Sequence, residues 1–190
     1  LAKDKVITND HIQSDAEYQK FSVDWMDAIT PHLERKNSFY IFNADKMVFA
    51  LRDGMLEAGL KFAQLLIWVK THAVVGRLDY TPQHELIAYG WFGTHEFVKG
   101  KDKSVLVYPK PNKSSMHPTT KPIPLIRHLI LNSTRVGDVV YDAFLGSGTT
   151  LLACEQTKRI CLGVEFDPEY CQTIIDRFEK LSGIKAERYE

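Results

Sequence analysis

A glycine-rich stretch at residues 142–150, Asp-Ala-Phe-Leu-Gly-Ser-Gly-Thr-Thr, has the composition of a ligand-binding turn. A short buried strand is predicted just before it, over residues 139–141, and the first turns of a helix over residues 151–155. Between a strand and a helix, glycines let the backbone approach a ligand, and the amides that begin the helix are free to donate hydrogen bonds. The stretch therefore predicts a ligand site, while an ordinary strand-to-helix turn stays open as the simpler interpretation.

A carboxylate stands at the end of the next predicted strand, which covers residues 160–165. Glu165 follows Gly146 by 19 residues, about where a Rossmann-like unit places the acid that binds ribose hydroxyls. The dinucleotide fingerprint needs a third glycine where Leu151 stands, and a phosphate-binding P-loop needs a lysine where Thr149 stands. The pattern therefore favours a nucleoside-like ligand but weakens both of these familiar interpretations.

Three blocks of sequence together resemble a known enzyme family. They are residues 117–122 (His-Pro-Thr-Thr-Lys-Pro), residues 142–150, and residues 163–170 (Gly-Val-Glu-Phe-Asp-Pro-Glu-Tyr). The set resembles the cofactor half of S-adenosylmethionine-dependent DNA amino-methyltransferases, which methylate adenine N6 or cytosine N4, and the order of the blocks is that of the permuted β class. The resemblance implies an α/β, Rossmann-like methyltransferase fold, with a mostly parallel sheet and helices on both faces. It also implies a single domain over residues 1–190.

The resemblance implies a cofactor, S-adenosylmethionine, and a set of residues that bind it. Thr119 and Lys121 are expected beside the methionine part of the cofactor, and Phe166 beside its adenine ring. The full expected set is Asp142, Phe144, Gly146, Ser147, Gly148, Thr149, Thr150, Glu165, Phe166, His117, Thr119 and Lys121.

Five lysines and a single aspartate gather in residues 99–113. Lysines in a loop suit contacts with DNA phosphates, which supply affinity without sequence information; a solvated loop is the alternative. The resemblance places a short target-recognition insertion here, at about residues 93–116. It also favours His84 and Glu85 in the target-base pocket, although a structural role at a strand start is equally open. The expected DNA-binding residues are Lys99, Lys101, Lys103, Lys110, Lys113, Arg77 and His84.

The catalytic tetrapeptide of the family, Asp/Asn/Ser-Pro-Pro-aromatic, is missing from these 190 residues, which contain no Pro-Pro pair. In the permuted order it belongs before residue 1, on a strand between those predicted at residues 139–142 and 38–42. Because Leu1 is not an initiator residue, we expect an N-terminally incomplete domain with upstream residues. The alternative is a divergent protein that has lost the chemistry.

Predicted elements that would position these residues follow from apolar spacing and capping signals. Further strands are predicted at residues 38–42, 62–69, 84–92 and 105–108. A helix is predicted from Ser14 or Asp15 to Ile29 and another after Asp45, which would cap it, with Val48, Leu51, Met55 and Leu56 on its apolar face. Two more are predicted over residues 122–133 and 168–182, the second between Asp167 and Gly183.

Composition limits the classes of protein that fit. The chain is 44% hydrophobic and 25% charged, with zero net charge, which is typical of a single soluble globular domain. No membrane span or signal peptide is predicted. The cysteines lack metal-ligand spacing and predict no metal site, so we expect Cys154, Cys161 and Cys171 to be reduced core residues of a cytoplasmic protein of bacterial or phage type.

The leading hypothesis is a site-specific DNA methyltransferase, with adenine N6 favoured over cytosine N4 because it is the commoner target in the family. Methylation at cytosine C5 is set aside, because none of the three cysteines follows a proline. The expected partner is double-stranded DNA, and the resemblance also suggests a homodimer and a restriction endonuclease partner. The alternatives are a non-catalytic DNA-binding or cofactor-sensing remnant, and an RNA or small-molecule methyltransferase.

Overall fold

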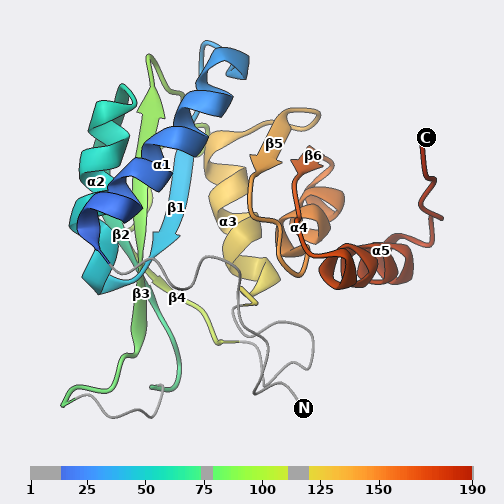
Figure 1. Ribbon diagram of the computed structural model, residues 1–190. Coiled ribbons are helices and arrows are strands. Elements are labelled where there is room, and N and C mark those ends of the chain that lie inside the picture. Colours follow the sequence, from blue (N-terminus) through green and yellow to red (C-terminus); the bar gives the residue numbers. More distant parts are fainter. Residues whose placement is uncertain (1–13, 74–78, 111–119, 190) are drawn as a thin grey trace. The chain divides into compact units, whose positions relative to one another are not determined.

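The computed structural model describes residues 14–73, 79–110 and 120–189 (Figure 1). These residues form two compact units. The first unit contains the chain up to Phe97 together with Lys101–Val107, and the second contains Val98–Gly100 and the chain from Tyr108 onward. Each unit has its own sheet and helices.

A four-stranded mixed sheet forms the centre of the first unit. Its strands are β1 (Phe39–Asn43), β2 (Leu60–Val69), β3 (His84–Phe92) and β4 (Val105–Val107), in the order β1-β3-β2-β4. β3 runs antiparallel to both of its neighbours, and β4 is parallel to β2. The carboxyl ends of β1, β2 and β4 therefore meet at the same edge of the sheet, where β3 begins.

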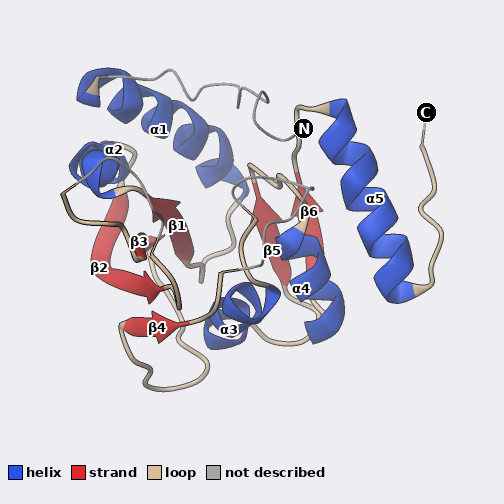
Figure 2. Cartoon of the chain, turned by 90° about the horizontal axis from the view of Figure 1, so that it is seen from below, coloured by secondary structure: helices blue, strands red, loops and turns tan. Residues whose placement is uncertain are grey.

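Two helices, α1 (Asp15–Ile29) and α2 (Val48–Glu57), pack side by side over one face of this sheet (Figures 1 and 2). The start of α1 confirms the prediction, because Ser14 and Glu17 form a capping box. The core beneath the helices is built from Met26, Phe39, Leu51, Met55, Ala58, Leu60 and Ala88.

Two details of the α2 prediction were wrong. Asp45 does not cap α2, because a short 3₁₀ turn (η2, Asp45–Met47) separates it from the helix, and its carboxylate instead lies 3.3 Å from His84 Nε2. Leu56 is exposed rather than part of the apolar face. A second 3₁₀ turn (η1, Thr30–His32) extends α1.

The second unit contains a parallel pair of strands, β5 (Val139–Asp142) and β6 (Ile160–Gly163), with three helices. Helix α4 (Thr149–Thr157) lies between α3 (Ile123–Ser133) and α5 (Pro168–Ser182) (Figure 2). The ends of α5 are those predicted, since the Asp167 side chain accepts from the Glu169 amide and Gly183 follows the helix in a left-handed conformation.

Burial of β5 differs from the prediction. Val139 and Tyr141 are exposed, and so are their neighbours on β6, Ile160 and Leu162. The reason is that these four side chains share one face of the β5–β6 pair, and α4 packs against the other face. The predicted α/β, Rossmann-like class is nevertheless confirmed. Within the described ranges, no helix has both the length and the apolar character needed to cross a membrane.

Candidate functional site

The glycine-rich turn lies at the carboxyl end of β5 and leads directly into α4. Asp142, the last residue of β5, organises the turn through both carboxylate oxygens. Its Oδ1 accepts a hydrogen bond from the Phe144 amide at 3.0 Å, and its Oδ2 accepts one from the Thr150 hydroxyl at 2.6 Å. The carboxylate therefore ties the start of the turn to the first turn of α4.

Glu165, which lies two residues after the end of β6, binds the glycine-rich turn. Its Oε2 accepts from the Gly146 amide at 2.7 Å, and its Oε1 accepts from the Asp167 amide at 2.9 Å. The Leu145 amide also donates to the Val164 carbonyl at 2.9 Å. These bonds bring the carboxyl ends of β5 and β6 together, although Gly146 and Glu165 are 19 residues apart.

Gly163 allows this close approach, a role that no motif in the sequence predicted. A Cβ built at Gly163 would lie 2.5 Å from Cδ2 of Leu145, far inside van der Waals contact. A side chain at this position would therefore force the Leu145 side chain out of its place in the turn. The motif spacing marks Gly146 and Gly148 but not Gly163, because the neighbour that excludes a side chain is distant in sequence.

Arg177 on α5 is a second residue that sequence reasoning missed. Its Nη1 donates a hydrogen bond to the carbonyl oxygen of Ser147, in the middle of the turn. Burial lowers the pKa of the Arg177 guanidinium from its usual value. Its only sequence signal is a cation at helical spacing from the buried Tyr170 and Ile174, which is not specific.

Replacing Arg177 with methionine is expected to weaken cofactor binding without unfolding the protein. The Arg177 guanidinium holds the Ser147 carbonyl in the middle of the turn, so we expect its loss to raise the cofactor Kd by roughly tenfold. Isothermal titration calorimetry measures this change. Lys180, also on α5, provides the control: Lys180→Met should leave Kd unchanged, and an unchanged Kd for Arg177→Met would contradict the role of the contact.

Residues just before α3 meet the same turn. The hydroxyl oxygens of Thr120 and Ser147 lie 3.2 Å apart, and the Thr149 hydroxyl donates to the Lys121 carbonyl at 3.3 Å. The structure thus brings the described end of the 117–122 block to the glycine turn. His117 and Thr119 lie outside the described residues.

Two aromatic rings flank this arrangement. Phe144, in the turn, is 58% exposed, and Phe166, directly after Glu165, is 86% exposed. An exposed ring next to a carboxylate suits a ligand with a flat apolar part and neighbouring hydroxyls. The site therefore offers acceptors for hydroxyls, backbone groups of a tight turn and aromatic surface, all within the second unit.

The expected DNA-binding residues are distributed over both units. Lys99 and Lys110 belong to the second unit, and Lys101 and Lys103 to the first; all four are exposed. His84 lies at the start of β3 in the first unit, where it contacts Asp45. Arg77 and Lys113 lie outside the described residues.

Comparison with known proteins gives a consistent result. A family model described as "DNA methylase" matches residues 3–176. The type II methyltransferase M.HpaI of Haemophilus parainfluenzae is 25% identical over 205 residues, which cover 94% of this chain and 65% of that relative. The chain thus spans less than two thirds of that relative's length.

Solved structures are also similar. The M1.HpyAVI–SAM complex has a TM-score of 0.74 and 26% identity, covering 82% of this chain and 81% of the other. The cytosine-N4-specific PvuII DNA methyltransferase has a TM-score of 0.76 at 18% identity, covering 93% of this chain and 74% of the other. The second likeness is one of fold.

Proposed function

Because the chain belongs to the DNA methylase family of N6-adenine and N4-cytosine type, we propose that it takes part in methyl transfer from S-adenosylmethionine to an exocyclic amine of a DNA base. The observation that carries this proposal is the hydrogen bond from the Gly146 amide to Glu165, which joins the ends of β5 and β6 into one ligand site. Adenine N6 is the proposed target in preference to cytosine N4.

Acceptor oxygens and an exposed aromatic ring in the second unit support this choice of cofactor. S-adenosylmethionine supplies an electrophilic methyl group on a positively charged sulfur. A carboxylate has about four acceptor positions, so Glu165 can hold two backbone amides and still accept from ribose hydroxyls. We assign the adenine to the exposed ring of Phe166, and the methionine part to Thr120, Lys121 and the turn at residues 146–148, which contact one another.

The amine chemistry needs no covalent intermediate with the protein. Its main requirements are in-line positioning of the amine and hydrogen bonds that orient it. We assign DNA phosphate contacts to the exposed lysines Lys99, Lys101, Lys103 and Lys110, within a target-recognition insertion at about residues 93–116 of a single methyltransferase domain. Double-stranded DNA is the proposed partner, with a homodimer and a restriction endonuclease as further proposed associations.

A product analysis tests the proposal. The protein, together with any residues that precede Leu1, is incubated with radiolabelled S-adenosylmethionine and unmethylated genomic DNA. The DNA is then digested, and its nucleosides are separated by chromatography. We expect label in N6-methyladenine, with N4-methylcytosine as the other outcome within the family. Calorimetry on the same preparation records cofactor binding separately.

Two results would overturn the proposal. Label in 5-methylcytosine would place the chemistry on carbon rather than on the amine. Cofactor binding without any transfer of label to DNA would instead favour the non-catalytic, cofactor-sensing alternative.

A further inference from the structure

Helix α3 holds the lysine-bearing stretch of the chain at two points within the second unit. At the first point, the Val98 amide donates a hydrogen bond to the Asn132 carbonyl oxygen at 2.7 Å. At the second point, the hydroxyl oxygen of Tyr108 lies 2.7 Å from Nδ1 of His128. All four residues belong to the second unit.

The Val98 contact also completes the end of the helix. The last four carbonyl groups of an α-helix have no partner within it, and Asn132 is the second-last residue of α3. The Val98 amide therefore supplies a partner to the helix while it holds the chain. Because His128 and Asn132 are four residues apart on α3, the two points of attachment lie about 6 Å apart along the helix axis.

The contact between Tyr108 and His128 fixes an orientation as well as a position. Their rings meet edge to face, with centroids 5.9 Å apart and planes at 66°, an arrangement that aromatic pairs prefer. A tyrosine hydroxyl can donate to a bare ring nitrogen or accept from a protonated one, so the hydrogen bond forms with either tautomer of His128. A purely apolar contact would leave Tyr108 free to slide along α3, whereas a directional bond does not.

A lysine stands close to each point of attachment. Lys99 comes immediately after Val98, and Lys110 comes two residues after Tyr108, so its Cα lies within about 8 Å of the Tyr108 Cα. Pro109, between them, has a fixed φ and confines Tyr108 to extended backbone. Both lysines are exposed and belong to the second unit. The contacts with α3 therefore determine where two ammonium groups can reach.

We propose that Tyr108 and His128 form a positioning pair for DNA binding, which holds Lys110 in place beside α3 so that it contacts a phosphate of the duplex. The Val98–Asn132 bond does the same for Lys99. This inference rests on the proposed function, in which DNA is the partner and these lysines contact its phosphates. Neither Tyr108 nor His128 touches the DNA itself.

Positioning decides the strength of such a contact because lysine is a point charge on a flexible stem. When the chain is released from α3, the ammonium group spreads over many positions, most of them out of reach of the phosphate. The contact is then lost, together with the counterions that it displaced. Each phosphate contact contributes about 0.9 to the magnitude of the slope of log K against log salt concentration.

The salt dependence of DNA binding tests the inference without requiring catalysis. The affinity of the intact protein for a short, fluorescently labelled DNA duplex is measured by anisotropy over a series of KCl concentrations. Lys110→Gln should lower the magnitude of the slope by about 0.9, the value for one phosphate contact. Tyr108→Phe removes a hydroxyl and no charge, yet it should raise the Kd at low salt and lower the slope by a similar amount.

Combined and conservative variants sharpen the test. Tyr108→Phe/Lys110→Gln should lose no more slope than Lys110→Gln, because both changes remove the same contact. His128→Phe keeps a ring without Nδ1 and should behave like Tyr108→Phe. His128→Asn retains a side-chain acceptor near the position of Nδ1 and should recover part of the slope.

A matched control is Tyr189→Phe, which removes the same atom from a side chain that is 89% exposed in the same unit. Its Kd for DNA and its slope should equal those of the wild type. A thermal melt of each variant checks that it is folded. Calorimetry should give the wild-type Kd for the cofactor in every variant, because the change is confined to DNA binding.

An unchanged slope for folded Tyr108→Phe and His128→Phe would overturn the inference, even with a higher Kd, because a loss of affinity without a loss of slope means that no phosphate contact depends on the pair. Methyl transfer to DNA by the wild type in that case would show that the proposed function stands without it. A slope that Lys110→Gln leaves unchanged would overturn both the phosphate contact of Lys110 and the role of the pair.

Discussion

Replacing Gly148 by alanine is expected to reduce cofactor affinity by roughly tenfold or more, which corresponds to about 1.4 kcal/mol or more of lost binding free energy. Gly148 precedes α4 with φ of 79°, a left-handed conformation that costs other residues about 1–2 kcal/mol. A Cβ at this position would also lie 3.0 Å from Cγ1 of Ile174 on α5. The strain and the contact both displace the turn, whose backbone we propose contacts the cofactor.

Gly137 provides a matched control for the backbone strain. Its φ is 87°, and a Cβ there would meet no atom within 4 Å. Gly137→Ala should therefore lower the melting temperature without changing the cofactor Kd, whereas Gly148→Ala should change both. Equal Kd values for the two variants, measured by calorimetry on folded protein, would show that the turn does not contact the ligand.

The Glu165→Gln variant is expected to show the second large effect. Both oxygens of Glu165 accept from backbone amides, those of Gly146 and Asp167. Glutamine has only one acceptor oxygen, so its NH₂ group would face one of these N–H donors. A part-buried donor left without an acceptor costs about 1–3 kcal/mol. The acceptors that we propose for the ribose are weakened at the same time, and we expect the cofactor Kd to rise by at least about tenfold.

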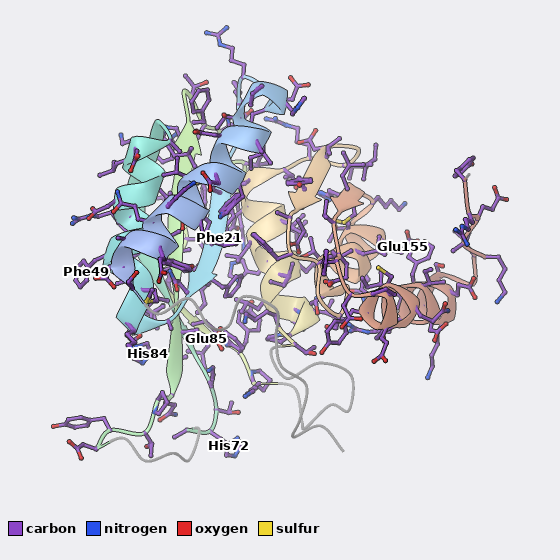
Figure 3. The ribbon with its side chains drawn as sticks, in the orientation of Figure 1. Phe21, Phe49, His72, His84, Glu85 and Glu155 are labelled. Atoms are coloured by element: carbon purple, nitrogen blue, oxygen red, sulfur yellow. The ribbon has the colours of Figure 1, made fainter. Side chains whose placement is uncertain are left out.

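Glu155, on the exposed side of α4, is the control for the loss of a negative charge (Figure 3). Glu155→Gln should leave both the cofactor Kd and the melting temperature unchanged. Calorimetry and a thermal melt on both variants provide the comparison. A Glu165→Gln protein that binds the cofactor like the wild type would refute the role of this carboxylate.

Several features of the fold followed directly from local sequence. Ser14 predicted the start of α1, and Asp167 and Gly183 predicted the two ends of α5. These predictions succeeded because a cap or a left-handed glycine acts within three or four residues of its partner. The spacing from Gly146 to Glu165 likewise predicted a carboxylate at the end of the strand that follows the glycine turn. The structure adds that this carboxylate accepts a hydrogen bond from the Gly146 amide.

Two predictions from the sequence were wrong because packing, and not the local pattern, decided the outcome. Asp45 was predicted to cap a helix but contacts His84 on β3, and β5 was predicted to be buried but has one exposed face. Asp45 meets a residue far along the chain, whereas the exposed face of β5 has no helix packed over it among the described residues. Propensity describes what a residue favours by itself, and packing decides between competing partners.

The sequence by itself determined the family, the positions of most helices and strands, and the glycine turn with its carboxylate. Only the tertiary structure revealed three contacts. They are the hydrogen bond from Arg177 to Ser147, the close approach of Leu145 to Gly163, and the ion pair of Lys70 and Glu85. Turns, caps and apolar periodicity depend on residues that are close together in the sequence, so one sequence is enough to predict them. Contacts between elements depend on how strands pair and helices pack, and a residue type alone does not specify its partner across that distance.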